Sequence, residues 1–149
     1  MEDGGAFEHA DVLSFNSYPG WYNGPASAVR ASWRGHAAWV AEHWPTKPFI
    51  ISETGAGGIA GNHSTNGTEP PRWSEEYQAV VDALDVSAAM SCGNVSGIAL
   101  WQLMDIKVDQ PVNSTNRPGG INNKGVLDQW RSPKLAAAQV ARAYAAVGS

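Results

Sequence analysis

Several side chains that could do chemistry stand where a predicted strand ends. The clearest is Glu53, which closes the apolar run "PFIISE" at 48–53 and is followed by a glycine-rich stretch. A carboxylate held in a pocket could act as a nucleophile, an acid or a base, whereas one in an exposed turn would do none of these. The other side chains in such positions are Asn16, Tyr18, Trp101 and Asp105.

These side chains would meet only if their strands run parallel in one sheet. The carboxyl ends of parallel strands lie at the same edge, and α/β proteins carry their sites there. A glutamate beside a tyrosine hydroxyl and an aromatic ring suits cleavage of a glycosidic bond, which takes one carboxylate as nucleophile and a second as acid and base. A hydrogen bond from Tyr18 would help to keep Glu53 ionised. By spacing alone, a glutamate that merely ends a strand is the alternative.

Three apolar runs predict the strands. Continuous apolar stretches of this length are typical of strands buried on both faces of a parallel sheet. The runs are 11–18, 48–53 and 97–103, and a polar loop follows each. The loop after Glu53 is long, and long loops without secondary structure are usually either functional or disordered.

A helix is predicted after each strand. From Ser27 to Trp44 apolar residues recur every three or four positions. Ser74 suits the N-cap of a second helix, and a third is expected to start at Ser132–Pro133, a cap followed by proline. The expected buried face of the first helix comprises Val29, Trp33, Ala37, Val40 and Trp44. That of the second comprises Tyr77, Val80, Val81 and Leu84.

Strand and helix repeated three times predict an α/β fold with a parallel sheet. A closed (β/α)8 barrel takes about 250 residues. The 149 residues present could therefore supply only part of one. A small domain of the flavodoxin type is the competing interpretation, and it is disfavoured because no glycine-rich phosphate loop follows the first strand.

Composition narrows the classes of function. The chain is 43% hydrophobic and 16% charged, with a net charge of -4 and no basic cluster, which argues against a nucleic-acid partner. No apolar run is long enough to predict a membrane span. The single cysteine, Cys92, excludes an intrachain disulfide framework and a CxxC metal site. The seven tryptophans could line a sugar site or pack in the core.

Localisation stays unknown from the sequence. The start, "MEDGGAFEHA", lacks the apolar core of a signal peptide. Four Asn-x-Ser/Thr sequons could carry glycans in a secretory or lysosomal lumen or outside the cell, or could arise by chance in a chain of this composition. They start at Asn62, Asn66, Asn94 and Asn113.

Five segments, in order, resemble the last part of the catalytic barrel of glycoside hydrolase family 2, the β-glucuronidase and β-galactosidase family. They are "DVLSFNSYPGWY", "KPFIISETGAGGIAGNHS", "WSEEYQ", "LWQLMD" and "NNKGVLDQWRSPKLAA". The resemblance covers nearly the whole chain and is closest to β-glucuronidases. It implies that residues 1–149 are a C-terminal fragment of a (β/α)8 TIM barrel, namely strands six to eight with their helices.

The resemblance also implies roles for individual residues. Glu53 matches the catalytic nucleophile, and Tyr18 matches the tyrosine that hydrogen-bonds it. Asn122 and Lys124 match an Asn-x-Lys pair that, in β-glucuronidases, grips the carboxylate of the sugar, and an ammonium with an amide donor suits a uronate. An ordinary surface lysine is the alternative for Lys124. The remaining substrate-binding positions are Asn16, Tyr22 and Trp101.

Other polar residues near these motifs are given lesser roles. His63 matches a family position near the site, but a loop histidine without a role is the simpler interpretation. Glu75 and Glu76 are expected to be charges in the first turn of a helix rather than catalytic groups. Asp105 is expected to orient loop backbone rather than to touch substrate.

Departures from the family pattern leave the sugar open. Thr54 stands where β-glucuronidases usually have tyrosine, and Ile121 looks inserted beside the Asn-x-Lys pair. The family's acid/base glutamate follows an asparagine at the end of strand four. This sequence has no Asn-Glu pair, and only 52 residues precede Glu53.

The resemblance therefore implies a retaining β-glycosidase of the β-glucuronidase type in the complete enzyme. The carbohydrate substrate and the missing N-terminal part of the same enzyme are the expected partners, and no cofactor or metal is implied. Without the acid/base residue, this chain is expected to be inactive alone. A β-galactosidase of the same family and a non-catalytic carbohydrate-binding remnant are the alternatives.

Overall fold

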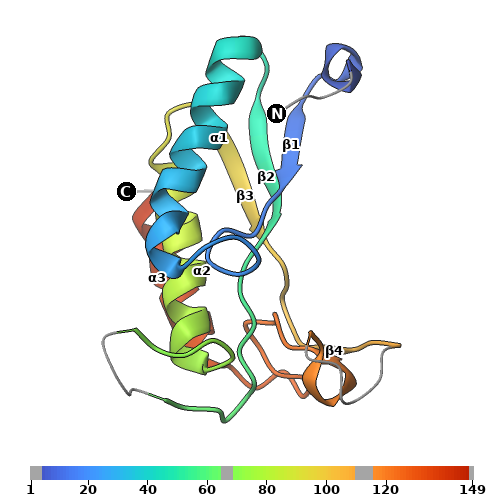
Figure 1. Cartoon of the computed structure of the whole chain (residues 1–149), viewed down its shortest axis with the longest axis vertical. Coiled ribbons are helices and arrows are strands. Elements are labelled where there is room, and N and C mark those ends of the chain that lie inside the picture. The colour runs from blue at the N-terminus through green and yellow to red at the C-terminus, as the bar shows by residue number, and fades with distance from the viewer. Residues whose placement is uncertain (1–4, 65–68, 110–115, 148–149) are drawn as a thin grey trace.

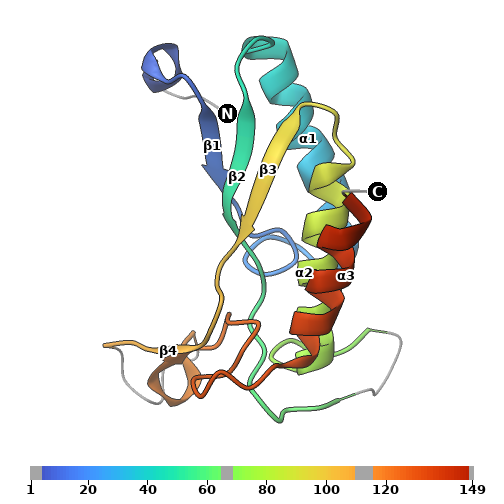
Figure 2. The ribbon, with the colours of Figure 1, turned by 180° about the vertical axis from the view of Figure 1, so that it is seen from behind.

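A parallel sheet covered on one face by helices forms the chain (Figures 1 and 2). The computed structural model describes residues 5–64, 69–109 and 116–147. The sheet has the strand order β1-β2-β3, which confirms the predicted α/β class with a parallel sheet. Its strands are β1 (Leu13–Asn16), β2 (Phe49–Thr54) and β3 (Val95–Leu100). The helices are α1 (Val29–His43), α2 (Glu75–Met90) and α3 (Leu135–Val147).

The carboxyl ends of the three parallel strands lie at the same edge of the sheet and point toward the end of the molecule that holds β4 (Figure 1). The β1–β2 pairing shifts register between Phe15 and Asn16, and the β2–β3 pairing shifts between Ile51 and Thr54. Both shifts flank Glu53. The backbone ladder is thus irregular where the predicted nucleophile stands, as is common beside active sites.

Loops after the strands fill the same end of the molecule. There β4 (Ile106–Lys107) and β5 (Ile121–Asn122) form a short antiparallel pair. Single-turn 3-10 helices lie in these loops at Ala26–Ala28 and Pro118–Gly120, whereas a third, Ala6–His9, precedes β1 and lies at the opposite end of the molecule (Figure 1). The loops that carry the predicted Asn-x-Lys pair and the aromatic residues after β1 therefore share one end with Glu53.

The core lies between the sheet and the helices. Leu13, Phe49 and Ile51 of the sheet pack with Trp33 of α1 and Val81 of α2, and none is more than 1% exposed. Burial of each such side chain contributes about 2 kcal/mol. The predicted stripe of α1 is confirmed, with Trp44 half-buried at its end.

Two details of the predicted helices are wrong. Val80 of α2 is 43% exposed, because that helix turns polar side chains toward the sheet instead. Helix α3 begins at Leu135, later than the predicted Ser132–Pro133, because Pro133 lies in a bridge with Leu127. Ser74 is confirmed as the N-cap of α2, since its side chain accepts a hydrogen bond from the amide of Tyr77.

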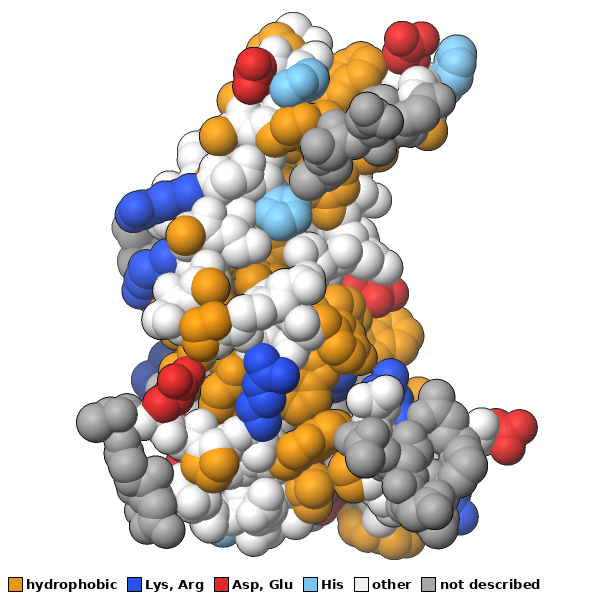
Figure 3. Space-filling view, viewed as in Figure 1, with side chains coloured by type: hydrophobic (Ala, Val, Ile, Leu, Met, Phe, Trp, Pro, Cys, Tyr) orange, Lys and Arg blue, Asp and Glu red, His pale blue; other side chains and the backbone are white. Residues whose placement is uncertain are grey.

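One face of the molecule mixes apolar and polar side chains, with lysine and arginine side chains among hydrophobic ones in its lower half (Figure 3). No helix in the described ranges is both long and apolar enough to cross a membrane. A sheet with helices packed on one face is what one sector of a (β/α)8 barrel would have. The assignment to strands six to eight of such a barrel stays a prediction.

Candidate active site

Glu53 and Tyr18 form the centre of the candidate site. The Tyr18 hydroxyl donates a hydrogen bond to Glu53 Oε2 at 2.8 Å, and both side chains are half-buried. Burial, and then the hydrogen bond and charge of Glu53, raise the pKa of Tyr18 above its usual range. Tyr18 therefore stays protonated at neutral pH and presents a fixed donor to the carboxylate.

The parallel sheet brings these two side chains together. Asn16, at the end of β1, is opposite Glu53 in the strand register. The chain then turns, and the amide of Ser17 donates to the carbonyl of Glu53 at 3.0 Å. This turn places Tyr18 against the Glu53 carboxylate.

A buried ammonium lies beside this pair. Lys124 is 2% exposed, and its Nζ is 4.5 Å from the ring centre of Trp21, 4.8 Å from that of Tyr22 and 5.6 Å from that of Tyr18. It donates to the Tyr22 hydroxyl at 3.2 Å. Burial lowers the pKa of Lys124, while the charge and hydrogen bond of Tyr22 raise it in part. None of the ion pairs among the described residues involves Lys124.

Arg117 adds a second cation. Burial alone would raise the pKa of Tyr22, but a hydrogen bond with Arg117 and the charge of Lys124 together lower it. The rings of Tyr18 and Tyr22 are 5.3 Å apart and nearly perpendicular. Two cations thus lie beside a tyrosine pair, one member of which donates to the Glu53 carboxylate, and this arrangement is suited to an anionic ligand.

The other predicted site residues stand at the margin of this cluster. The Asn16 side chain is exposed, and its Oδ1 accepts a hydrogen bond from Ser52 Oγ at 2.7 Å. Trp101 is 38% exposed, and its amide donates to the carbonyl of Thr54 at 2.7 Å. Asn122 is buried, and its Oδ1 has no hydrogen-bond partner among the described residues.

Asp105 and Lys134 fix the loop that carries Lys124. Asp105 Oδ1 accepts from the amide of Gly125 at 2.8 Å and from Lys134 Nζ at 3.0 Å. Lys134 also donates to the carbonyl of Gly58 at 2.7 Å. A Cβ at Gly125 would lie 2.2 Å from the Asp105 amide nitrogen, so only glycine fits there. The expectation that Asp105 orients loop backbone is confirmed.

Side chains of α2 tie the loops together. Gln78 Nε2 donates to the carbonyl of Ala56 at 3.1 Å and to that of Gly125 at 2.9 Å. Glu75 accepts from the amides of Gly61 at 2.8 Å and Leu135 at 2.7 Å. Glu75 thus lies in the first turn, as predicted, but it is buried and holds two loops.

Glu76, in the first turn of α2, and His63 form a pair at the surface. The exposed His63 lies with its Nδ1 3.0 Å from Glu76 Oε1. The hydrogen bond with Ser64 and the contact with His63 help to lower the pKa of Glu76, against the effect of burial. Nothing in this contact assigns His63 to the site around Glu53.

Comparisons with known proteins identify relatives of this chain. The β-glucuronidase of Paenibacillus borealis is 30% identical over 150 residues, which cover 93% of this chain and 22% of that protein. A β-galacturonidase of glycoside hydrolase family 2 from Eisenbergiella tayi, bound to galacturonate, is 34% identical with a TM-score of 0.80, over 91% of this chain and 24% of that one. The Bifidobacterium dentium β-glucuronidase, complexed with coumarin-3-O-glucuronide, is 30% identical with a TM-score of 0.78, over 92% and 21%. The chain is related to the family 2 glycoside hydrolases.

The match is partial in length. The chain spans about a fifth of the curated relatives named β-glucuronidase. No protein-family model matches it. The relatedness of this family 2 segment therefore rests on the ordered sequence match and on the shared fold.

Five residues of this family 2 segment were not predicted to serve the site. They contact its members or the backbone beside them: Trp21, Asp82, Asp85, Arg117 and Lys134. One signal was available for the two aspartates. Asp82 and Asp85 are spaced so that they share the apolar face of α2, where an acid needs a buried partner. For the other three, only the folded loops bring them to the site.

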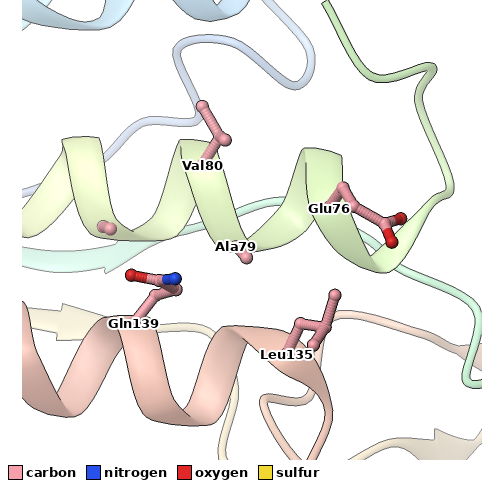
Figure 4. Close-up of a pocket in the computed structure, with 6 residues that line it drawn as sticks. Glu76, Ala79, Val80, Leu135 and Gln139 are labelled. Carbon is pink, nitrogen blue, oxygen red and sulfur yellow. The ribbon is translucent and has the colours of Figure 1, made fainter. Parts of the chain in front are cut away.

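A separate hollow of about 430 Å³ lies between α2 and α3 in this family 2 segment. Ala79 and Gln139 face one another across it, and Leu135 and Glu76 lie toward one end (Figure 4). None of its lining residues was predicted to bind sugar. Within the described ranges, no group of three or more His, Cys, Asp or Glu is placed to hold a metal ion.

Proposed function

We propose that this chain supplies the nucleophile and the uronate-binding wall of a retaining β-glucuronidase, as part of a longer enzyme. One observation carries the proposal. The Glu53 carboxylate is fixed by Tyr18, and the buried Lys124 ammonium lies 5.6 Å from the ring centre of that tyrosine and forms no ion pair with a carboxylate among the described residues. A sugar carboxylate would supply that partner while the anomeric carbon faces Glu53.

Glu53 acts as the nucleophile in this mechanism. Its free oxygen attacks the anomeric carbon while the bond to the leaving oxygen breaks, and a covalent glycosyl ester forms. Tyr18 donates to the other oxygen and holds the carboxylate in its attacking orientation. A second carboxylate, from outside these 149 residues, protonates the leaving oxygen and then activates the water that releases the sugar. The two carboxylates would lie about 5 Å apart.

The cations favour a uronide over a galactoside as the substrate. Lys124 and Arg117 would pair with the sugar carboxylate, and the Asn122 amide would donate to it. A galactoside has no carboxylate and would leave the buried ammonium without an ion-pair partner, which is costly. Glucuronide and galacturonide both carry the carboxylate, and a β-galacturonidase is among the structural relatives. A β-galacturonide is therefore the second candidate substrate.

The decisive experiment places this chain in a complete barrel. A hybrid is made in which the 149 residues replace the matching segment of the Bifidobacterium dentium enzyme, and turnover of aryl β-glucuronide, β-galacturonide and β-galactoside is measured. We expect turnover of a uronide that Glu53→Gln abolishes and that the exposed control Glu42→Gln preserves. With Glu53→Ala, added azide should restore turnover and give the α-glycosyl azide, because azide replaces the nucleophile on the same face.

Lys124→Met tests the substrate class in the same hybrid. We expect a rise of KM for the uronide of at least about tenfold, with little change for any galactoside turnover. Uronide turnover that survives Glu53→Gln would refute the proposal. The 149-residue chain alone should bind a uronate without turning over a glycoside. Turnover by that chain, abolished by Glu53→Gln, would show that no outside acid is needed.

A further inference from the structure

Two carboxylates are buried on the face of α2 that packs against the sheet. Asp82 is 1% exposed and Asp85 is 0% exposed. Burial raises the pKa of both, that of Asp85 to about 7, while hydrogen bonds to each carboxylate oppose the shift. Buried acids are costly unless their hydrogen bonds are made. Their partners therefore identify what they stabilise.

Asp85 joins α1 to the end of β2. Its Oδ1 accepts from the Trp33 indole at 2.7 Å, and its Oδ2 accepts from the Thr54 hydroxyl at 2.9 Å. Thr54 is 0% exposed and Trp33 is 1% exposed, so this network is sealed from water. Hydrogen bonds to a carboxylate in such surroundings are strong and directional.

Asp82 holds the next part of the same segment. Its Oδ1 accepts from the amide of Ala56 at 2.8 Å. Gly55, between the two clamped residues, has φ 136°, a conformation that a side chain would disfavour. A Cβ there would also lie 2.9 Å from the carbonyl oxygen of Trp101. The backbone from Thr54 to Ala56 is thus fixed from the helix side.

This segment immediately follows Glu53. Neighbouring residues of a strand point to opposite faces, so fixing the Thr54 side chain on the helix face sets the direction in which Glu53 leaves the other face. The strand register shifts on both sides of Glu53, so the ladder alone defines its orientation weakly. The hydrogen bonds of Asp85 with Thr54 and of Asp82 with Ala56 supply the missing constraint.

We propose that Asp85 is a positioning residue, which keeps the Glu53 carboxylate against Tyr18 through its hydrogen bond with Thr54. Asp82 supports it by holding the amide of Ala56. The catalytic meaning of this positioning rests on the proposed function of Glu53. The positioning itself is a property of the fold. It gives a role to Thr54, the residue after the proposed nucleophile, because its hydroxyl donates to Asp85 at 2.9 Å.

The test reads the contact between Tyr18 and Glu53 directly. The chain, with tyrosines labelled at the ring carbon that bears the hydroxyl, is titrated by NMR from pH 7 to 11. In the unmodified chain the Tyr18 hydroxyl should stay protonated throughout, so its NMR signal should keep its position. Glu53→Gln, which removes the charge beside Tyr18, should lower the pKa of Tyr18 and sets the scale.

Thr54→Val keeps the shape and removes only the hydroxyl. We expect it, and Asp85→Leu, to make the Tyr18 signal begin to titrate at a lower pH than in the unmodified chain, as Glu53→Gln does. The conservative Thr54→Ser and Asp85→Asn should keep the original titration, and the exposed Thr46→Val is the matched control. Should Asp85→Leu fail to fold, Thr54→Val decides alone. A Thr54→Val chain that is less stable but titrates like the original at Tyr18 overturns the proposal.

Kinetics in the hybrid enzyme give a second, separable readout. Thr54→Val should lower kcat by about tenfold or more and leave KM unchanged, because a displaced nucleophile binds sugar normally but attacks slowly. An unchanged kcat would count against the proposal. A hybrid without uronide turnover would count against the proposed function alone, since the NMR result does not depend on sugar chemistry.

Discussion

Asp85 should make the stability of this protein fall as pH rises through the neutral range. The folded state holds the pKa of Asp85 at about 7, against an ordinary value of 3.8. Between these values the folded protein carries a proton that the unfolded chain has lost. The free energy of unfolding therefore decreases with rising pH. The contribution is complete below about pH 4 and is gone above about pH 7.

The size of the effect follows from the pKa difference. Each pH unit across the window costs about 1.4 kcal/mol, so the whole window amounts to about 4 kcal/mol. Burial raises the pKa of Asp82 and Asp105 as well, and both would add to the same trend. The comparison with Asp85→Asn isolates Asp85, because the amide has the same shape and does not titrate.

The assay is urea denaturation of the unmodified protein and of Asp85→Asn at matched pH values from 4 to 9. The variant should gain about 4 kcal/mol relative to the unmodified protein between the acid and alkaline ends. Buffers of equal ionic strength remove surface-charge effects. A difference between the two proteins that changes by less than about 1 kcal/mol over this range would refute the reasoning.

Three further changes test other parts of the fold. Tyr18→Phe should lower kcat for a uronide in the hybrid by about tenfold or more with little change in KM, because it removes a donor to the nucleophile; an unchanged kcat would exclude that role. Lys134→Met should destabilise the protein by about 3–5 kcal/mol in thermal unfolding, because it leaves Asp105 buried without its counter-charge, and a loss below about 1 kcal/mol would contradict this. Ser74→Ala should cost about 1 kcal/mol in the same assay, since the N-cap hydrogen bond to Tyr77 is lost, whereas Ser74→Thr should cost less.

The repeating elements could be predicted because their signals are local. Apolar runs before Asn16 and Glu53 indicate strands, and Ser74 marks a helix start through its own side chain. The fold adds what depends on distant partners. The exposure of Val80 was missed because the hydrophobic pattern of α2 does not reveal that Asp82 has a partner on the sheet side.

The site shows the same division. Motif order pointed to Glu53, Tyr18 and Lys124, and the fold places these three in one cluster. The contribution of Trp21 and Arg117 could not be predicted, because loops far apart in sequence bring them there. Spacing along a chain carries no information about such contacts.

The two hydrogen bonds that Gln78 Nε2 donates have a consequence for how substrate preference could be changed. One amide group holds both Ala56, beside the nucleophile, and Gly125, beside the buried ammonium. Exchanging the loop that carries Lys124 and Gly125 would therefore also disturb the backbone beside Glu53, unless the incoming loop keeps a carbonyl at the position of Gly125. Under the proposed function, substrate selectivity and rate would be coupled through Gln78, and a gain in one without a loss in the other would require side-chain changes that leave both hydrogen bonds in place.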